Sequence, residues 1–181
     1  FLTDGFETVE ALAVIDILRR AGIEVETVSI TGNEQVCSAQ NITVKADTLF
    51  KAQPVCKEDV LFLPGGPGHE QYNECKPLLK LLEKHHAEGG RIAAICAAPS
   101  ILGHLGILNG KKATAFPGFE KDLTGAEVLT APVKVVTDGN ITTARGMGAS
   151  IELGLELVRL LISEEKAQEI GRSVQYLEKQ A

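Results

Sequence analysis

The sequence predicts an α/β fold in which a doubly wound, mostly parallel sheet carries helices on both faces. Short apolar runs alternate with segments of helical periodicity along most of the 181 residues, the pattern of strands separated by helices. Two of the runs, residues 60–63 and 91–95, are almost continuously apolar, as buried parallel strands are. Turns rich in small residues follow both runs, at the sheet edge where such folds bind ligands.

The first part of the chain is expected to hold one helix and several short strands. We expect the opening residues to be the end of an apolar strand whose start is missing. Residues 7–21 predict a helix closed by Gly22. Apolar side chains surround its axis, so this helix should be covered on two sides. Residues 23–30 alternate like a strand, and residues 36–50 have room for one or two short strands.

The rest of the chain alternates strands and helices without an internal repeat or linker, and we expect a single domain over residues 1–181. In chain order we expect a strand at 60–63, a helix at 78–86, a strand at 91–95, a helix at 97–108, a short strand near Thr114, a hairpin of 133–137 with 141–144, and helices at 149–162 and 164–177.

Composition and charge disfavour several kinds of partner. The formal charge is −6, the pI is near 5.3, and no run of lysine or arginine occurs, which argues against nucleic acid and anionic membranes. No apolar stretch approaches the ~20 residues that cross a bilayer. Cys37, Cys56, Cys75 and Cys96 form no C-x-x-C pair, so we expect neither a metal site nor a disulfide framework. Scattered thiols fit a cytoplasmic protein.

Cys96 is the leading candidate for a reactive group. It follows the strand at 91–95 and precedes the helix at 97–108, and the loops after Leu2 and after residue 63 should lie at the same sheet edge. At such an elbow the side chain is exposed and the helix N-terminus favours a thiolate. Nearby amides would hold an oxyanion. A buried cysteine that fills a tight turn fits the same position, so position alone leaves both interpretations open.

Four segments resemble the successive signature blocks of the DJ-1/PfpI family (the DJ-1/ThiJ group). They are DGFETVE at 4–10, LPGG at 63–66, AAICAAP at 93–99 and ARGMG at 144–148. They follow the family's order and spacing, and together they span nearly the whole chain. The resemblance implies a flavodoxin-like fold, similar to class I glutamine amidotransferases, with Cys96 at a nucleophile elbow.

The resemblance also implies roles for the residues around the elbow. It makes Cys96 the nucleophile and redox-sensitive thiol, Glu10 its partner carboxylic acid, and the amides of Gly65, Gly66 and Ala97 the oxyanion donors. A carboxyl group buried beside a thiolate should stay protonated and donate a hydrogen bond to the sulfur. By spacing alone, Glu10 would be an ordinary first-turn acid that complements a helix dipole.

No histidine is an obvious partner for Cys96. Where relatives of the family carry a histidine before a proline, this chain has Phe116. His104 would lie about 12 Å along a helix from Cys96. His69 follows the glycine loop and could line the pocket. Ala97 stands where peptidase-like relatives have histidine, which disfavours peptidase activity. Amidotransferase domains need a Cys-His-Glu triad, and because no histidine here is a candidate for it, glutaminase activity is disfavoured too.

The resemblance implies a cofactor-independent enzyme that acts on small reactive carbonyls. The expected substrates are 2-oxoaldehydes or glycated side chains, as for glyoxalase III or deglycase activity. The alternative is a non-catalytic redox sensor or chaperone in which Cys96 is oxidised to a sulfinate.

The chain is also expected to form a homodimer. Val14, Ile15 and Leu18 of the first helix would leave apolar surface in water if the chain were alone. The family resemblance implies the same assembly, with Arg20 reaching toward the partner's active site.

Overall fold

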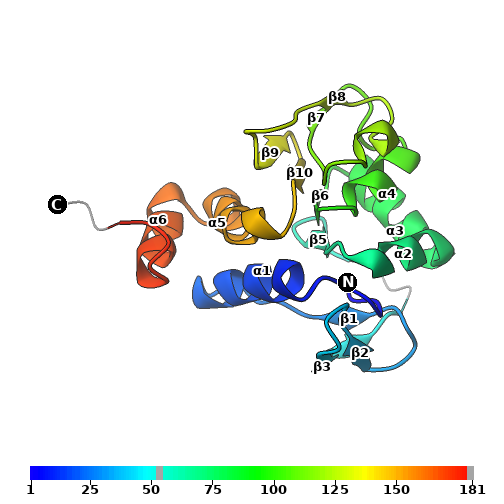
Figure 1. Ribbon diagram of the computed structural model, residues 1–181, viewed down its shortest axis with the longest axis horizontal. Helices are drawn as coiled ribbons and strands as arrows, with labels where there is room; N and C mark the ends of the chain where they lie inside the picture. Colours follow the sequence, from blue (N-terminus) through cyan, green and yellow to red (C-terminus); the bar gives the residue numbers. More distant parts are fainter. Residues whose placement is uncertain (52–54, 179–181) are drawn as a thin grey trace.

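The computed structural model describes residues 1–51 and 55–178 and has the predicted doubly wound architecture. A sheet of order β5-β6-β10-β9 forms its centre (Figure 1). β5 (Val60–Leu63), β6 (Arg91–Ile95) and β10 (Ile141–Ala144) are parallel, and β9 (Val135–Asp138) runs antiparallel to β10. The carboxyl ends of β5, β6 and β10 therefore meet at one edge.

Short strand pairs and the opening residues extend this centre. The pairs are β1 (Val28–Ser29) with β4 (Thr48–Leu49), β2 (Gln35–Cys37) with β3 (Thr43–Lys45), and β7 (Lys112–Ala113) with β8 (Glu127–Val128). The Leu2 amide donates to the Val28 carbonyl at 2.7 Å, and the Phe1 amino group donates to the Phe62 carbonyl at 2.8 Å. The opening segment thus lies between β1 and β5, like the strand end that we expected.

Helices cover both faces of the sheet. They are α1 (Thr8–Arg20), α2 (Glu70–Glu74), α3 (Lys76–Ala87), α4 (Pro99–His104), α5 (Ser150–Leu161) and α6 (Glu164–Ser173). On β6, Ile92 and Ala94 pack in the apolar cluster that includes α3 and α4, whereas Ala93 and Ile95 pack with α1 and α5. Successive strand residues face opposite sides, so this one strand anchors both layers.

The packing of α1 corrects our argument for a dimer. Val14 and Leu18 are buried within the chain itself, in the cluster that contains α5, and Ile15 packs against a smaller cluster near the N-terminus. α1 and α5 approach closely at Gly154, where a Cβ atom would come within 2.9 Å of the Ile17 side chain. These apolar residues therefore need no second copy to cover them. On α1, Val9 is the large apolar side chain left 44% exposed.

Three predicted elements are shorter than expected. The helix predicted over 164–177 ends at Ser173. The helix predicted over 97–108 is only Pro99–His104, because the chain turns into the left-handed region at Gly106. In place of the strand predicted over 23–30, only Val28–Ser29 pairs.

Among the described helices, none has the length and apolar character needed to traverse a lipid bilayer.

Candidate active site

The backbone at Cys96 forms a constrained elbow between β6 and α4. Its φ of 66° lies in the left-handed region, which costs an L-residue free energy. The Cys96 amide donates to the Ala144 carbonyl at 2.9 Å, and the Cys96 carbonyl accepts from the Phe116 amide at 2.8 Å. Two neighbouring segments therefore hold Cys96 in this conformation, at the end of the central strand.

The glycine loop after β5 lies directly against the elbow. A Cβ atom at Gly65 would be 2.6 Å from both the Cys96 Cβ and the Glu10 Oε2, closer than real side chains approach. The Gly68 amide donates to the Gly5 carbonyl at 3.0 Å, which joins this loop to the loop after Leu2. The loop after Leu2, the glycine loop after β5 and the elbow at Cys96 thus meet at the carboxyl edge of the sheet, as expected.

Glu10 enters the site from the first turn of α1, and its side chain is 1% exposed. The Gly65 amide donates to its Oε2 at 3.0 Å. The Met147 amide donates to the carboxyl group as well, and the Cys96 thiol is hydrogen-bonded to it. Glu10 is therefore a buried acid in direct contact with the sulfur.

Burial sets the protonation of this acid. Burial, followed by the charge of Glu7, raises the pKa of Glu10 to about 7, against the opposing effect of hydrogen bonds from Cys96, Gly65 and Met147. Near neutral pH, Glu10 therefore exchanges between a proton donor and a proton acceptor, as an acid–base catalyst must.

The thiol differs from the sequence-based expectation. Burial, then the charge of Glu10 and its hydrogen bond, raise the pKa of Cys96 to about 12, although the amides of Gly66 and Ala97 lower it. The expected helix dipole is weak because α4 is short and begins at Pro99. A thiolate forms most readily when Glu10 takes the proton, since a neutral Glu10 no longer repels negative charge on the sulfur.

The backbone amides divide between the two reactive groups. The amides of Gly66 and Ala97 donate to the Cys96 sulfur, as oxyanion donors beside a nucleophile would. The Gly65 amide donates to Glu10 instead. In this arrangement the Gly65 amide orients the acid, and its expected role as an oxyanion donor stays a prediction.

The remaining predicted residues surround the elbow at different distances. Phe116 is 47% exposed, and its ring comes within 3.1 Å of a Cβ built at Gly146. His69 is buried, with its Nδ1 3.0 Å from the Gly66 carbonyl and its ring edge-on to Phe119. Since a carbonyl only accepts hydrogen bonds, Nδ1 carries the proton. His69 thus supports the glycine loop.

Arg20 is not brought to this site within the chain. It lies ten residues beyond Glu10 on α1, about 15 Å away at the helical rise of 1.5 Å per residue. Its Nε pairs with the Asp16 carboxylate at 2.6 Å. The expected contact with a partner's site stays a prediction.

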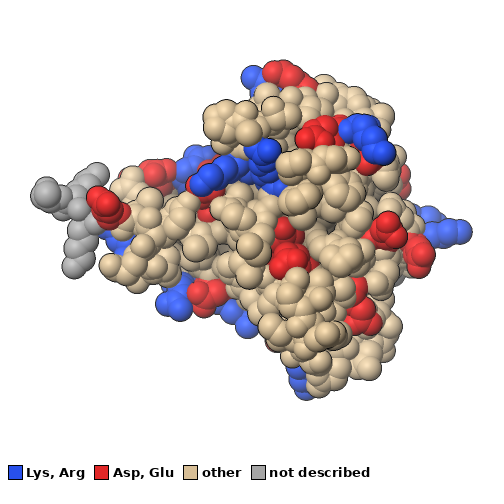
Figure 2. Space-filling view, in the orientation of Figure 1, with Lys and Arg blue, Asp and Glu red and all other residues tan. Residues whose placement is uncertain are grey.

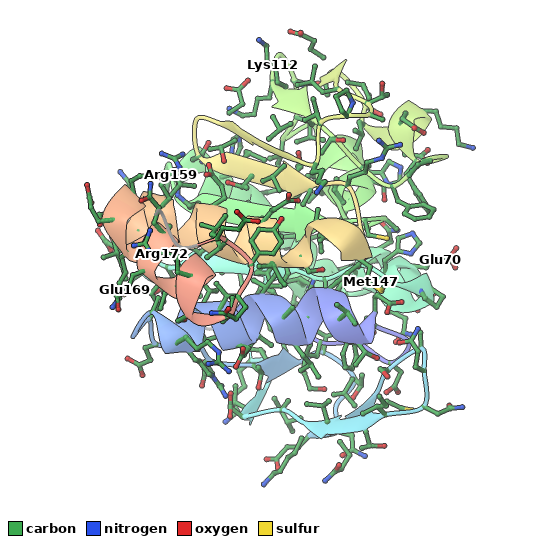
Figure 3. All side chains as sticks on the ribbon, turned by 60° about the vertical axis from the view of Figure 1, so that its left-hand side comes forward. Glu70, Lys112, Met147, Arg159, Glu169 and Arg172 are labelled. Carbon is green, nitrogen blue, oxygen red and sulfur yellow. The ribbon has the colours of Figure 1, made fainter. Side chains whose placement is uncertain are left out.

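The turn after β10 was missed as part of the site. It brings Gly146 and the Met147 amide to Glu10. Figure 3 shows Met147 beside the N-terminal end of α1. The parallel pairing of β10 with β6 puts this turn at the carboxyl edge. The sequence did single this turn out, as the block ARGMG at 144–148, but no role in the site was assigned to it.

In the described ranges 1–51 and 55–178, no group of three histidine, cysteine or acidic side chains is placed to hold a metal ion. The four cysteines are all unpaired. The chemistry that this arrangement offers is that of one thiol, one buried acid and two amides.

Comparison with known proteins finds relatives in the family that the sequence resembles. Residues 1–160 match the DJ-1/PfpI family. The chain is 35% identical to the protein dj-1beta of Drosophila melanogaster, over 96% of this chain and 93% of that protein. It is 32% identical to a protein of Pyrococcus abyssi named a deglycase, over 87% of this chain and 95% of that one.

Longer relatives and solved structures agree. The Arabidopsis thaliana protein DJ-1 homolog A is 38% identical over 94% of this chain, yet the chain spans only 44% of that protein's length, and 38% of the length of homolog B. The structure of oxidised Toxoplasma gondii DJ-1 superposes with a TM-score of 0.91 at 33% identity, covering 98% of this chain and 96% of that one.

Proposed function

The chain belongs to the DJ-1/PfpI family, and we propose that it acts through Cys96 on small reactive carbonyls, as a glyoxalase III or deglycase does. The observation that carries this proposal is the contact between a buried acid with a pKa of about 7 and the thiol of a strained elbow. The archaeal relative named a deglycase supports the same substrate class.

The reaction of a 2-oxoaldehyde would begin with addition of the sulfur to the aldehyde carbon. Glu10 takes the thiol proton, the new C–S bond forms, and the carbonyl oxygen becomes an oxyanion. The amides of Gly66 and Ala97, which flank the sulfur, are the donors available to stabilise it. Protonation of the oxyanion then gives a thiohemiacetal.

Glu10 would next move a proton between the two carbons of the substrate. It removes the proton from the former aldehyde carbon and returns one to the neighbouring carbon, which becomes the alcohol. The product on Cys96 is a thioester, which water cleaves to a 2-hydroxy acid and the free thiol. One carbon is oxidised and its neighbour reduced, so the reaction needs no external oxidant or cofactor. Reversal of an analogous addition would release a carbonyl from a glycated side chain.

Lactate formation from methylglyoxal tests the proposal. Cys96→Ser should abolish turnover, and Glu10→Gln should lower kcat by about 10²-fold or more because a positioned acid–base group contributes that much. Cys56→Ser, which changes an exposed cysteine outside the elbow, is the matched control and should keep full activity. Undiminished lactate formation by Cys96→Ser would refute the proposal.

A redox sensor is the second candidate, and the donors around the sulfur favour it. The Gly66 and Ala97 amides and a protonated Glu10 would hold the oxygens of a sulfinate on Cys96. Mass spectrometry after mild peroxide should then find oxygen on Cys96 before Cys37 or Cys75. Oxidation without any turnover of methylglyoxal would favour this function over the enzymatic one.

We further propose that the protein works in the cytosol as a homodimer. Four unpaired thiols suit a reducing compartment. In a two-fold dimer, Arg20 would be the residue expected to approach the partner's site.

A further inference from the structure

Glu7 adjoins the glycine loop beside the site. It is the last residue before α1, and its amide donates to the Gly65 carbonyl at 3.0 Å. A Cβ at Gly66 would collide with the Glu7 nitrogen, so the two backbones touch. The Gly66 amide in turn donates to the Cys96 sulfur. Glu7 is therefore one contact away from the reacting atom.

A glutamine fixes the Glu7 carboxylate in place. The Gln40 Nε2 donates to the Glu7 Oε2 at 3.1 Å, and the Gln40 Oε1 accepts from the Thr8 hydroxyl at 2.6 Å. The loop that carries Gln40 is itself tied to the site, because the Ala39 amide donates to the Phe6 carbonyl at 2.9 Å. The carboxylate therefore has a defined partner at the protein surface.

Acidic side chains gather near the start of α1. The Glu7 carboxylate acts electrostatically on Glu10. Figure 3 places Glu70 toward the same end of the molecule as the start of α1. Figure 2 shows acidic side chains at the centre of the face over that start, with a group of lysine and arginine side chains above them on the same face. Arg145, the cation that precedes Gly146, acts electrostatically on Glu120.

We propose that Glu7 makes the site select its carbonyl substrates by charge. The fixed carboxylate favours uncharged aldehydes and adducts carried on neutral or cationic side chains. It disfavours carbonyl compounds whose carbonyl adjoins a carboxylate, because two negative charges would be brought together in a partly desolvated pocket. The identity of the substrates rests on the proposed function, but the charge selection at Cys96 does not depend on turnover.

Alkylation of Cys96 tests this selection independently of catalysis. Iodoacetamide and iodoacetate have nearly the same shape and differ by one negative charge. Both form an S–C bond while iodide leaves with the bonding electrons. The rate ratio of iodoacetamide to iodoacetate at Cys96, measured by peptide mass spectrometry and divided by the ratio for free cysteine, isolates the charge effect. In the unchanged protein we expect it to exceed one and to fall as salt screens the charges.

Two matched variants assign the effect to Glu7. Glu7→Gln should lower the normalised ratio about fivefold, the order expected for removing one charge several ångströms away in a partly aqueous site. Glu169→Gln removes the same charge from α6, at the opposite end of the molecule in Figure 3, and should leave the ratio unchanged.

Each outcome bears on the proposal. A normalised ratio of one in the unchanged protein, an equal ratio in Glu7→Gln, or no dependence on salt would overturn it. If Glu7→Gln does not fold, Gln40→Ala, which removes the hydrogen bond to the Glu7 carboxylate, should lower the ratio instead, and an unchanged ratio would overturn the proposal. If methylglyoxal is not turned over but the alkylation ratio behaves as expected, the proposed function fails while the charge selection stands.

Discussion

Replacing Glu10 by glutamine should stabilise the fold increasingly as the pH rises. Burial raises the pKa of Glu10 from its ordinary value of 4.5 to about 7 in the folded chain. The folded state therefore holds this proton more tightly than the unfolded chain does. The stability that the protonated acid contributes is complete below the unfolded pKa of 4.5 and is lost as the pH rises through about 7.

The size of the effect follows from these two values. A displacement from 4.5 to about 7 corresponds to about 3 kcal/mol of unfolding free energy at high pH. Glutamine has nearly the same shape and carries no charge, so it avoids this loss. Between pH 5 and pH 8.5 the stability of Glu10→Gln relative to the unchanged protein should rise by about 2–3 kcal/mol.

Urea unfolding of both proteins at several pH values measures the difference. The interval stops at pH 8.5 because the Cys96 thiol begins to contribute at higher pH. Glu24→Gln, at an exposed acid between α1 and β1, is a control that should follow the unchanged protein within about 0.5 kcal/mol. If the stability difference between Glu10→Gln and the unchanged protein did not vary with pH, burial would not be what raises the pKa of Glu10.

Three further predictions concern the elbow and the assembly. Gly65→Ala should lower kcat at least tenfold and destabilise the fold by about 1–3 kcal/mol, since its Cβ would strike Cys96 and Glu10, whereas Gly148→Ala, with open space around it, should change neither activity nor urea stability. In urea unfolding, the free energy of unfolding of Cys96→Gly should exceed that of Cys96→Ser by about 1 kcal/mol, because glycine adopts a positive φ without strain. Equal stability of the two variants would argue against backbone strain at Cys96. Light scattering at micromolar concentration should give a dimer mass, reduced by Val9→Glu; a monomer mass for the unchanged protein would contradict this.

The sequence predicted those elements whose limits are set locally. β5 and β6 have the bounds that were predicted, because each is an apolar run that ends at a turn of small residues. The hairpin of β9 and β10 was found from its turn. The packing of α4 depends on a distant contact, because a side chain at Gly103 would collide with the Asp122 carbonyl of a later turn. No periodicity in the sequence contains that information.

The protonation of Cys96 and Glu10 also depends on contacts between distant parts of the chain, which the sequence pattern does not reveal. Position at an elbow argues for a low thiol pKa, and that argument is sound for a sulfur at the start of a long helix. It fails for Cys96 because Glu10 arrives from a helix far away in the chain, in a site that burial desolvates. The two groups then share one proton between them, and the pKa values describe the pair.

Reactivity should accordingly follow the ionisation of Glu10. The value of kcat/KM should therefore rise with pH toward a plateau above about 7, and Glu10→Gln should remove this rising limb of the pH profile. A limb of unchanged position in that variant would mean that another group receives the Cys96 proton.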